Sequence, residues 1–190
     1  MFFPIASATR RQAKSAHELA MVNLILVNLL MLIALLAGSF LQHGSPLADY
    51  KLVGVLVPFL ISLGIIVFTF IKAARLAGTG PWFVAAHWRL ATLRYRILLI
   101  AYAVGAGLIG GGWLLSTAQK SAGMQELMFV ALQRVAIAPV LIVLMVLIML
   151  ESGALYQAGR GEVPDSLIKR YPAPPDLQGG DAEFSPEDPS

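Results

Sequence analysis

The chain contains no cysteine, and only 13% of its 190 residues are charged. The absence of cysteine excludes disulfides, thiolate metal sites, iron–sulfur ligation and cysteine nucleophiles. The low charge content argues against a soluble domain, in which about a quarter of the residues are charged. Apolar residues make up 57% of the chain and gather in long runs that a soluble core does not need. These features predict an integral membrane protein.

Four apolar runs are long enough to cross a bilayer, whose hydrocarbon core requires about 20 residues per helix. We therefore predict an all-α integral membrane protein with four transmembrane helices, over Ala20–Gln42, Leu52–Ile71, Ile97–Ser116 and Leu127–Leu150. The basic residues before the first run are followed by a full spanning length, so they do not predict a cleavable signal peptide. The expected organisation is a basic N-terminal segment, a four-helix membrane domain and a Pro-rich acidic tail, over residues 1–19, 20–156 and 157–190.

The Lys and Arg residues predict the orientation, because cytoplasmic loops carry an excess of them. Eleven of the fourteen fall before the first span, between the second and third spans, or after the fourth. The loops on the opposite side hold Lys51 and Lys120. This alternation predicts that both termini lie in the cytoplasm of a bacterial-type inner membrane. Since topology accounts for the net charge of +3, the charge does not predict nucleic-acid binding.

The loop between the second and third spans is expected to contain an interfacial amphipathic helix. Pro81 suits the first turn of a helix. Apolar residues then recur at helical spacing, at Trp82, Phe83, Ala86, Leu90 and Leu93. A helix of this kind lies in the membrane surface. Trp82 and Trp88 are accordingly expected at the level of the lipid headgroups.

The C-terminal tail differs in composition from the rest of the chain. From Tyr171 onward it has five prolines, five acidic residues and no basic residue. Such a segment buries too little apolar surface to offset the entropy lost on ordering. We expect it to be disordered unless a partner protein holds it.

The third span contains Gly105–Gly110, which matches the GxGxxG dinucleotide fingerprint. That fingerprint requires a strand before it and a soluble helix after it, and here it lies inside an apolar span. Small residues at four-residue spacing instead let helix backbones approach closely. Two such rows are present, Ala103, Gly107, Gly111 and Ala106, Gly110. They predict tight contacts within the chain or with a neighbouring protein.

Asn23 and Asn28 lie in the first span, where each carboxamide requires a hydrogen-bond partner. Interhelical pairs of this kind contribute on the order of 1 kcal/mol. Five residues of α-helix separate the two side chains by about 140°, so they are expected to face different neighbours. Packing is the main interpretation, and a solute or ion path is the alternative.

Arg134 makes the fourth span the least regular one. Sixteen uncharged residues, Val135–Leu150, follow it and form about 24 Å of helix, slightly less than the bilayer core. Arg134 either reaches the outer interface along its aliphatic stem or lies in a helix that begins near Gln125. In the second case it faces protein or an acidic lipid.

His17, His43 and His87 raise the question of haem b, which requires two facing axial ligands. None lies in the middle of a span, although His17 and His87 could meet near the cytoplasmic surface. No serine or threonine has a base beside it, and no two carboxylates share a membrane face. The sequence therefore predicts no enzyme, no cofactor and no metal site.

The function expected from these features is a non-catalytic structural or assembly subunit of a larger inner-membrane complex. Its expected partners are the lipid bilayer and other membrane protein subunits. Respiratory, secretion and conjugation complexes all remain open. A small oligomeric transporter or channel is one alternative, and a haem b-binding electron-transfer subunit is another.

Overall fold

The computed structural model describes residues 1–38, 51–177, 179 and 180. Over these residues the regular secondary structure is helical, and the rest consists of turns, loop residues and two isolated β-bridges. Four helical stretches are long and apolar enough to cross a membrane, Ser7–Leu36, Leu52–Thr79, Trp82–Thr117 and Ala122–Arg160. The prediction of an all-α protein with four candidate membrane spans is confirmed.

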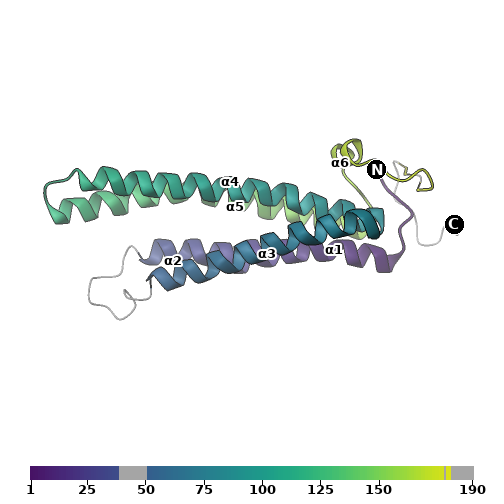
Figure 1. The fold of residues 1–190 in the computed structure, drawn as a ribbon, viewed down its shortest axis with the longest axis horizontal. Helices are drawn as coiled ribbons and strands as arrows, with labels where there is room; N and C mark the ends of the chain where they lie inside the picture. The colour runs from purple at the N-terminus through teal and green to yellow at the C-terminus, as the bar shows by residue number, and fades with distance from the viewer. Residues whose placement is uncertain (39–50, 178, 181–190) are drawn as a thin grey trace. The chain divides into compact units, whose positions relative to one another are not determined.

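The first stretch is not one uniform α-helix. It consists of α1 (Ser7–Val22), a π-helix η1 (Asn23–Leu29) and α2 (Leu30–Gly38). The remaining elements are α3 (Lys51–Thr79), α4 (Trp82–Thr117), α5 (Ala122–Arg160) and the short α6 (Asp165–Arg170). Figure 1 shows α4 and α5 running side by side as a hairpin.

The helices are longer than the apolar runs that predict them. With 36 residues in α4 and 39 in α5, each helix measures more than about 50 Å, well beyond the bilayer core of about 30 Å. The amphipathic segment predicted after Pro81 is the beginning of α4, and it continues without a break into the third span. Whether its first turns lie in the membrane surface stays a prediction.

The chain divides into two compact units, and each long helix contributes to both. The first unit comprises Met1–Asn23, Leu63–Tyr95 and Ile148–Ser190. Its core gathers small residues of α1, aromatic residues of α4 and apolar residues that follow α5, among them Ala13, Ala16, Phe83, Trp88, Val163 and Leu167. The second unit comprises Leu24–Ser62 and Arg96–Leu147. Its buried apolar residues include Leu24, Met31, Leu32, Leu98, Ile137 and Leu144.

In the first unit, the N-terminal residues pair with the segment that follows α5. The Phe3 amide donates to the Gly161 carbonyl over 2.9 Å, and the Val163 amide donates to the Met1 carbonyl over 3.0 Å. Phe2 and Gly180 exchange two backbone hydrogen bonds of 2.8 Å. Gly161 has a φ of +76°, a conformation that glycine adopts without the strain of a side chain.

The beginning of the acidic tail packs against the first unit. Tyr171, Ala173 and Leu177 contact its core, and the Trp82 indole donates to the Tyr171 carbonyl over 3.3 Å. The structure thus differs from the predicted disorder over Tyr171–Leu177, because these few apolar side chains find a surface within the chain. Residues 178 and 181–190 lie outside the described residues.

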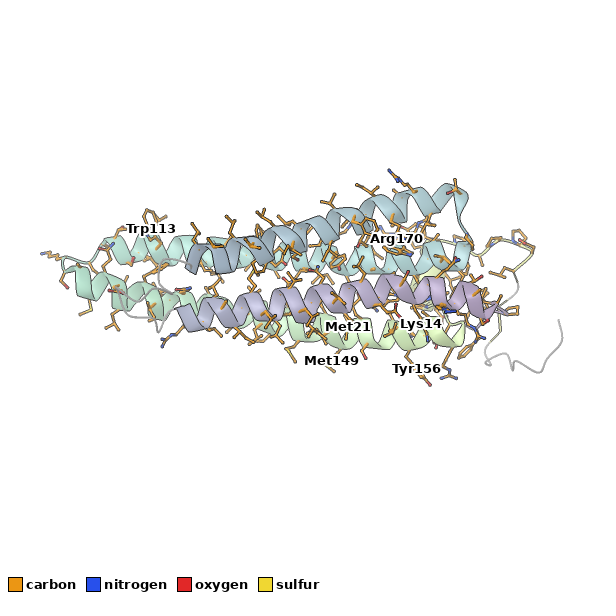
Figure 2. All side chains as sticks on the ribbon, turned by 90° about the horizontal axis from the view of Figure 1, so that it is seen from below. Lys14, Met21, Trp113, Met149, Tyr156 and Arg170 are labelled. Carbon is orange, nitrogen blue, oxygen red and sulfur yellow. The ribbon has the colours of Figure 1, made fainter. Side chains whose placement is uncertain are left out.

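Large apolar side chains cover the outside of the helices. Leu52, Val135 and Met149 are each more than 70% exposed, and Figure 2 shows Trp113 and Met149 directed away from the ribbon. Exposure of this kind is costly in water and is expected where lipid covers the surface.

Candidate functional site: a buried histidine–glutamate array

The first unit encloses three ionisable side chains from three helices. His17 of α1 and His87 of α4 have no exposed surface, and Glu151 of α5 is 1% exposed. Ala13, Ala16 and Ala20 lie within one helical turn of His17 and are themselves buried. Their small side chains allow neighbouring helices to approach α1 closely at His17.

The three side chains form a linear hydrogen-bonded array. His17 Nδ1 lies 2.6 Å from Glu151 Oε2. On the other side of the ring, His17 Nε2 lies 2.9 Å from His87 Nδ1. His87 Nε2 lies 3.2 Å from the backbone carbonyl oxygen of Glu162. The two imidazole rings meet edge to face, with centroids 5.1 Å apart.

The carbonyl at one end of the array fixes the direction of its hydrogen bonds. A carbonyl oxygen only accepts, so His87 Nε2 must carry a hydrogen. In a neutral His87 ring Nδ1 is then an acceptor, and His17 Nε2 must donate to it. The remaining contact, between His17 Nδ1 and Glu151, also needs one hydrogen. The pair is therefore either an imidazolium with a carboxylate or an imidazole with a carboxylic acid.

Arg94 provides a positive charge beside this pair. Its Nη1 atom lies 3.4 Å from Glu151 Oε2, but Nη1 makes no hydrogen bond within the described residues. The contact is therefore a charge–charge interaction rather than a well-directed hydrogen bond. The Arg94 guanidinium thus adds a positive charge directly beside the carboxyl group of Glu151.

Asn23, predicted from the sequence as a packing residue, is fully buried in the first unit. Its amide donates to the Tyr95 hydroxyl over 3.3 Å. Asn23 also begins the π-helix η1, in which residues five apart are hydrogen-bonded. The predicted angle of about 140° to Asn28 assumes regular α-helix and does not apply here, because a π-helix has more residues per turn than an α-helix.

Asn28 belongs to a closed polar cluster in the second unit. Its amide donates to Ser62 Oγ over 3.0 Å. Its carbonyl oxygen accepts from the Tyr102 hydroxyl, and Ser62 Oγ lies 2.7 Å from that hydroxyl. Since Tyr102 donates to Asn28, the Ser62 hydroxyl donates to Tyr102. Each of the three side chains thus donates to the next around a ring.

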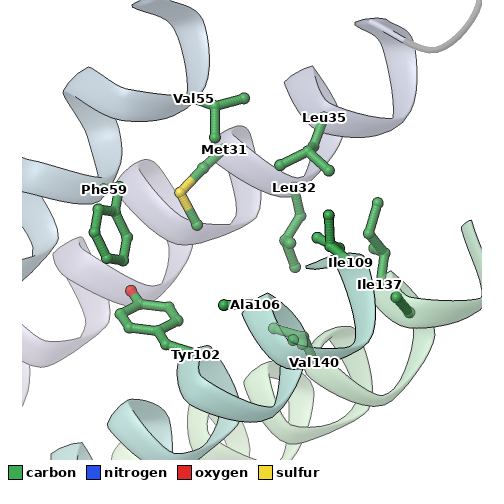
Figure 3. A pocket seen from close by; sticks show the side chains of 12 residues that line it. Met31, Leu32, Leu35, Val55, Phe59, Tyr102, Ala106, Ile109, Ile137 and Val140 are labelled. Carbon is green, nitrogen blue, oxygen red and sulfur yellow. The ribbon is translucent and has the colours of Figure 1, made fainter. Parts of the chain in front are cut away.

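An apolar pocket of about 190 Å³ lies beside the Tyr102 ring (Figure 3). Met31, Phe59, Ala106 and Val140 are among the side chains that line it. Because the hydroxyl of Tyr102 is already engaged with Asn28 and Ser62, the pocket offers a ligand mainly apolar contacts.

The glycines of α4 divide between two faces. A Cβ at Gly105 would lie 2.8 Å from a methyl of Val140, and one at Gly112 would lie 3.0 Å from Leu132 Cβ. These two glycines provide the close approach of α4 to α5. A Cβ at Gly107 or Gly111 would meet nothing within 4 Å. The row predicted for tight packing is therefore not used within the described part of the chain.

The remaining predicted residues differ in their surroundings. Trp82 stacks edge to face on Phe3 at 5.0 Å, whereas Trp88 is 1% exposed and lies beneath the Lys72 ammonium group. Their depth in a membrane stays a prediction. Arg134 is exposed, and α5 begins at Ala122, about three turns before it.

Sequence reasoning missed the centre of the site. It noted that His17 and His87 could meet, and the structure brings them together with both side chains fully buried. It did not select Glu151 or Arg94. The available signal was that an acidic residue directly follows one long apolar run, while a histidine lies three residues before the start of another.

No family model, no curated protein and no solved structure matches this chain. What the fold and the site establish is a class: a helical protein with four candidate membrane spans and a buried histidine–glutamate array.

Proposed function

We propose that the chain is a non-catalytic structural or assembly subunit of a larger inner-membrane complex. The observation that carries the proposal is the open glycine face of α4, defined by Gly107, Gly110 and Gly111. A Cβ at any of these positions would meet nothing within 4 Å. Small residues on one face of an apolar helix are typical of surfaces that receive another membrane helix.

A groove beside the glycine face supports the same function. It has a volume of about 240 Å³ and is lined by residues of α4 and α5, including Gly107, Gly111, Leu132 and Val135. A ridge of side chains on a neighbouring helix fits a groove of this kind.

The proposed orientation places both termini in the cytoplasm. The first unit contains the N-terminal segment, most of the basic middle loop and the segment after α5. These are the parts of the chain in which the Lys and Arg residues concentrate. Their inclusion in one compact unit supports a common, cytoplasmic side.

The polar contacts favour a structural role over transport. Asn23 bonds to Tyr95, and Asn28 bonds to Ser62 and Tyr102. Side chains engaged with one another in this way act as packing contacts. A haem between His17 and His87 fits the geometry poorly. Two metal–nitrogen bonds of about 2 Å would separate the ligand nitrogens by about 4 Å, whereas these nitrogens are 2.9 Å apart.

Co-purification in a mild detergent tests the proposal. The full-length tagged protein is expected to retain other membrane polypeptides, and the double variant G107L/G111L is expected to lose them. The matched control is G54L/G64L, because these two glycines of α3 are also open but have no small residue four positions away. A wild-type protein that runs alone, or equal loss in both variants, would contradict the proposal.

A further inference from the structure

We propose that the array of Glu151, His17 and His87 is a proton-binding site. Its bound proton holds the segment at Glu162 against α4, because it maintains the hydrogen bond from His87 to the Glu162 carbonyl. The ligand is a single proton, and the site is separate from the glycine face on which the proposed function rests.

Three hydrogen bonds connect Glu151, His17, His87 and the Glu162 carbonyl. Each needs one hydrogen. Two neutral imidazoles supply one hydrogen apiece, and a carboxylate supplies none. The observed arrangement therefore holds one proton more than a carboxylate with two neutral histidines. That additional proton is the bound ligand.

Loss of this proton has a defined consequence. His17 Nδ1–H remains as donor to the Glu151 carboxylate, and His17 Nε2 becomes an acceptor. In the proposed deprotonated state His87 donates to it through Nδ1, which removes the hydrogen from its Nε2 atom. The proton leaves to water, and the charge of the array changes from zero to −1 without any change at a heavy-atom bond. His87 Nε2 now presents a lone pair to the Glu162 carbonyl oxygen, 3.2 Å away.

Two facing acceptors repel each other, so the deprotonated array releases the carbonyl of Glu162. This residue lies between Gly161 and Val163, which hold the N-terminal residues through two backbone hydrogen bonds. The bound proton therefore supports the pairing of Met1–Phe3 with the segment after α5. The proton is bound when His87 donates to the Glu162 carbonyl. Raising the pH therefore removes this hydrogen bond, and lowering the pH again restores it.

A second additional proton does not fit on the two imidazoles. It would place hydrogens on both His17 Nε2 and His87 Nδ1, which are 2.9 Å apart. The two histidines thus carry one additional proton, and either further uptake by the imidazoles or loss breaks a hydrogen bond.

The basic groups of the first unit that pack near its core include residues of α1, α3 and α4. Arg94 of α4 lies against Glu151. Arg10 of α1 donates to the Gly159 carbonyl, and Lys14 of α1 also lies against Gly159. Lys72 of α3 lies over the Trp88 ring. Among these groups, Arg94 is the one in direct contact with the array.

Histidine nitrogen NMR of the full-length protein in lipid nanodiscs tests the proton count. At the acid side of the transition, His87 is expected as the tautomer protonated on Nε2. At the alkaline side it is expected as the tautomer protonated on Nδ1. The pH range is about 4 to 9, which covers histidine sites shifted by several units. A His87 ring that keeps its hydrogen on Nε2 throughout, or is doubly protonated at the acid side, overturns the proposal.

Amide hydrogen exchange over residues 161–163 tests whether the bound proton holds this segment in place. The rates are expressed as protection factors, which removes the intrinsic effect of pH on exchange. Protection in the wild-type protein is expected to fall roughly tenfold or more above the transition, as when a buried acceptor loses its donor.

The variant E151Q sharpens the exchange measurement. A glutamine amide donates permanently to His17 Nδ1, so all three hydrogen bonds persist without a titrating proton. Its protection factors are expected to be independent of pH. The control is E18Q, the same change at an exposed position of α1, which should follow the wild type. If E151Q does not fold, the wild-type tautomer measurement alone decides. A wild-type protection factor that does not change with pH refutes the fastening.

Discussion

The two compact units bury polar groups of different kinds. The first unit holds ionisable side chains, Glu151, His17 and His87, with Arg94 beside them. The second holds a neutral ring of Asn28, Ser62 and Tyr102. In the neutral ring each group donates once within the ring and needs no additional proton. The ionisable array is complete only with one, so its stability depends on pH. Both units thus satisfy buried polar groups with hydrogen bonds. Only the hydrogen bonds of the ionisable array depend on the pH of the solvent.

The largest expected effect comes from removing the carboxylate of the array. Glu151→Leu leaves His17 Nδ1 without a donor or acceptor and leaves the Arg94 charge without its anion. Breaking one side of a buried charged contact costs about 3–5 kcal/mol. We expect unfolding in detergent, followed by circular dichroism, to show a loss in this range. Glu18→Leu, at an exposed position of α1, should change stability by less than about 1 kcal/mol.

A smaller loss is expected from opening the neutral ring. Tyr102→Phe removes the hydroxyl that donates to Asn28 and accepts from Ser62. A buried group left unsatisfied costs about 1–3 kcal/mol. Unlike the change at Glu151, this loss should be the same at every pH, as measured by parallel unfolding curves.

The control for Tyr102→Phe is Tyr156→Phe, since Tyr156 is 62% exposed. Its stability should lie close to that of the wild-type protein. A pH-dependent loss in Tyr102→Phe would break the distinction between the two units, because it would show that the ring also exchanges a proton.

The pH dependence of stability should itself separate the two units. The array binds its additional proton in the folded state, and an unfolded chain at alkaline pH holds none at these groups. Stability from this proton is therefore lost as the pH rises through the transition of the folded site. The loss should be about 1–2 kcal/mol, the worth of one buried hydrogen bond to a carbonyl.

The variant Glu151→Gln should remove that slope, and Tyr102→Phe should retain it. Chemical denaturation at a series of pH values measures both. A slope that survives in Glu151→Gln would assign the pH dependence to another group.

Much of the fold could be predicted from hydropathy, because a run of about 20 apolar residues is a property of a single segment. The four candidate spans are of this kind. The site depends instead on which residues of different helices meet. His17 and Glu151 are 134 residues apart in sequence, and nothing in either segment specifies their pairing. The π-helix at Asn23–Leu29 was missed for a related reason, since apolar periodicity does not distinguish it from an α-helix.

The glycines of α4 show the same limit, because their spacing predicts close packing but not its partner.

The smallest expected effect on the isolated chain is that of Gly107→Leu with Gly111→Leu. Both positions are open, so stability should change by less than about 1 kcal/mol, and replacing helical glycine offsets part of any loss. Gly105→Leu should cost about 1–3 kcal/mol by overpacking, because its Cβ would already press on Val140.

Unfolding curves of these variants, recorded beside the co-purification assay, separate folding from association. The expected pattern is a stable Gly107→Leu, Gly111→Leu protein that no longer retains its neighbours, and a Gly105→Leu protein that is destabilised. If Gly107→Leu with Gly111→Leu were as destabilised as Gly105→Leu, the glycine face would be an internal contact of this chain. The case for an external partner at that face would then be lost.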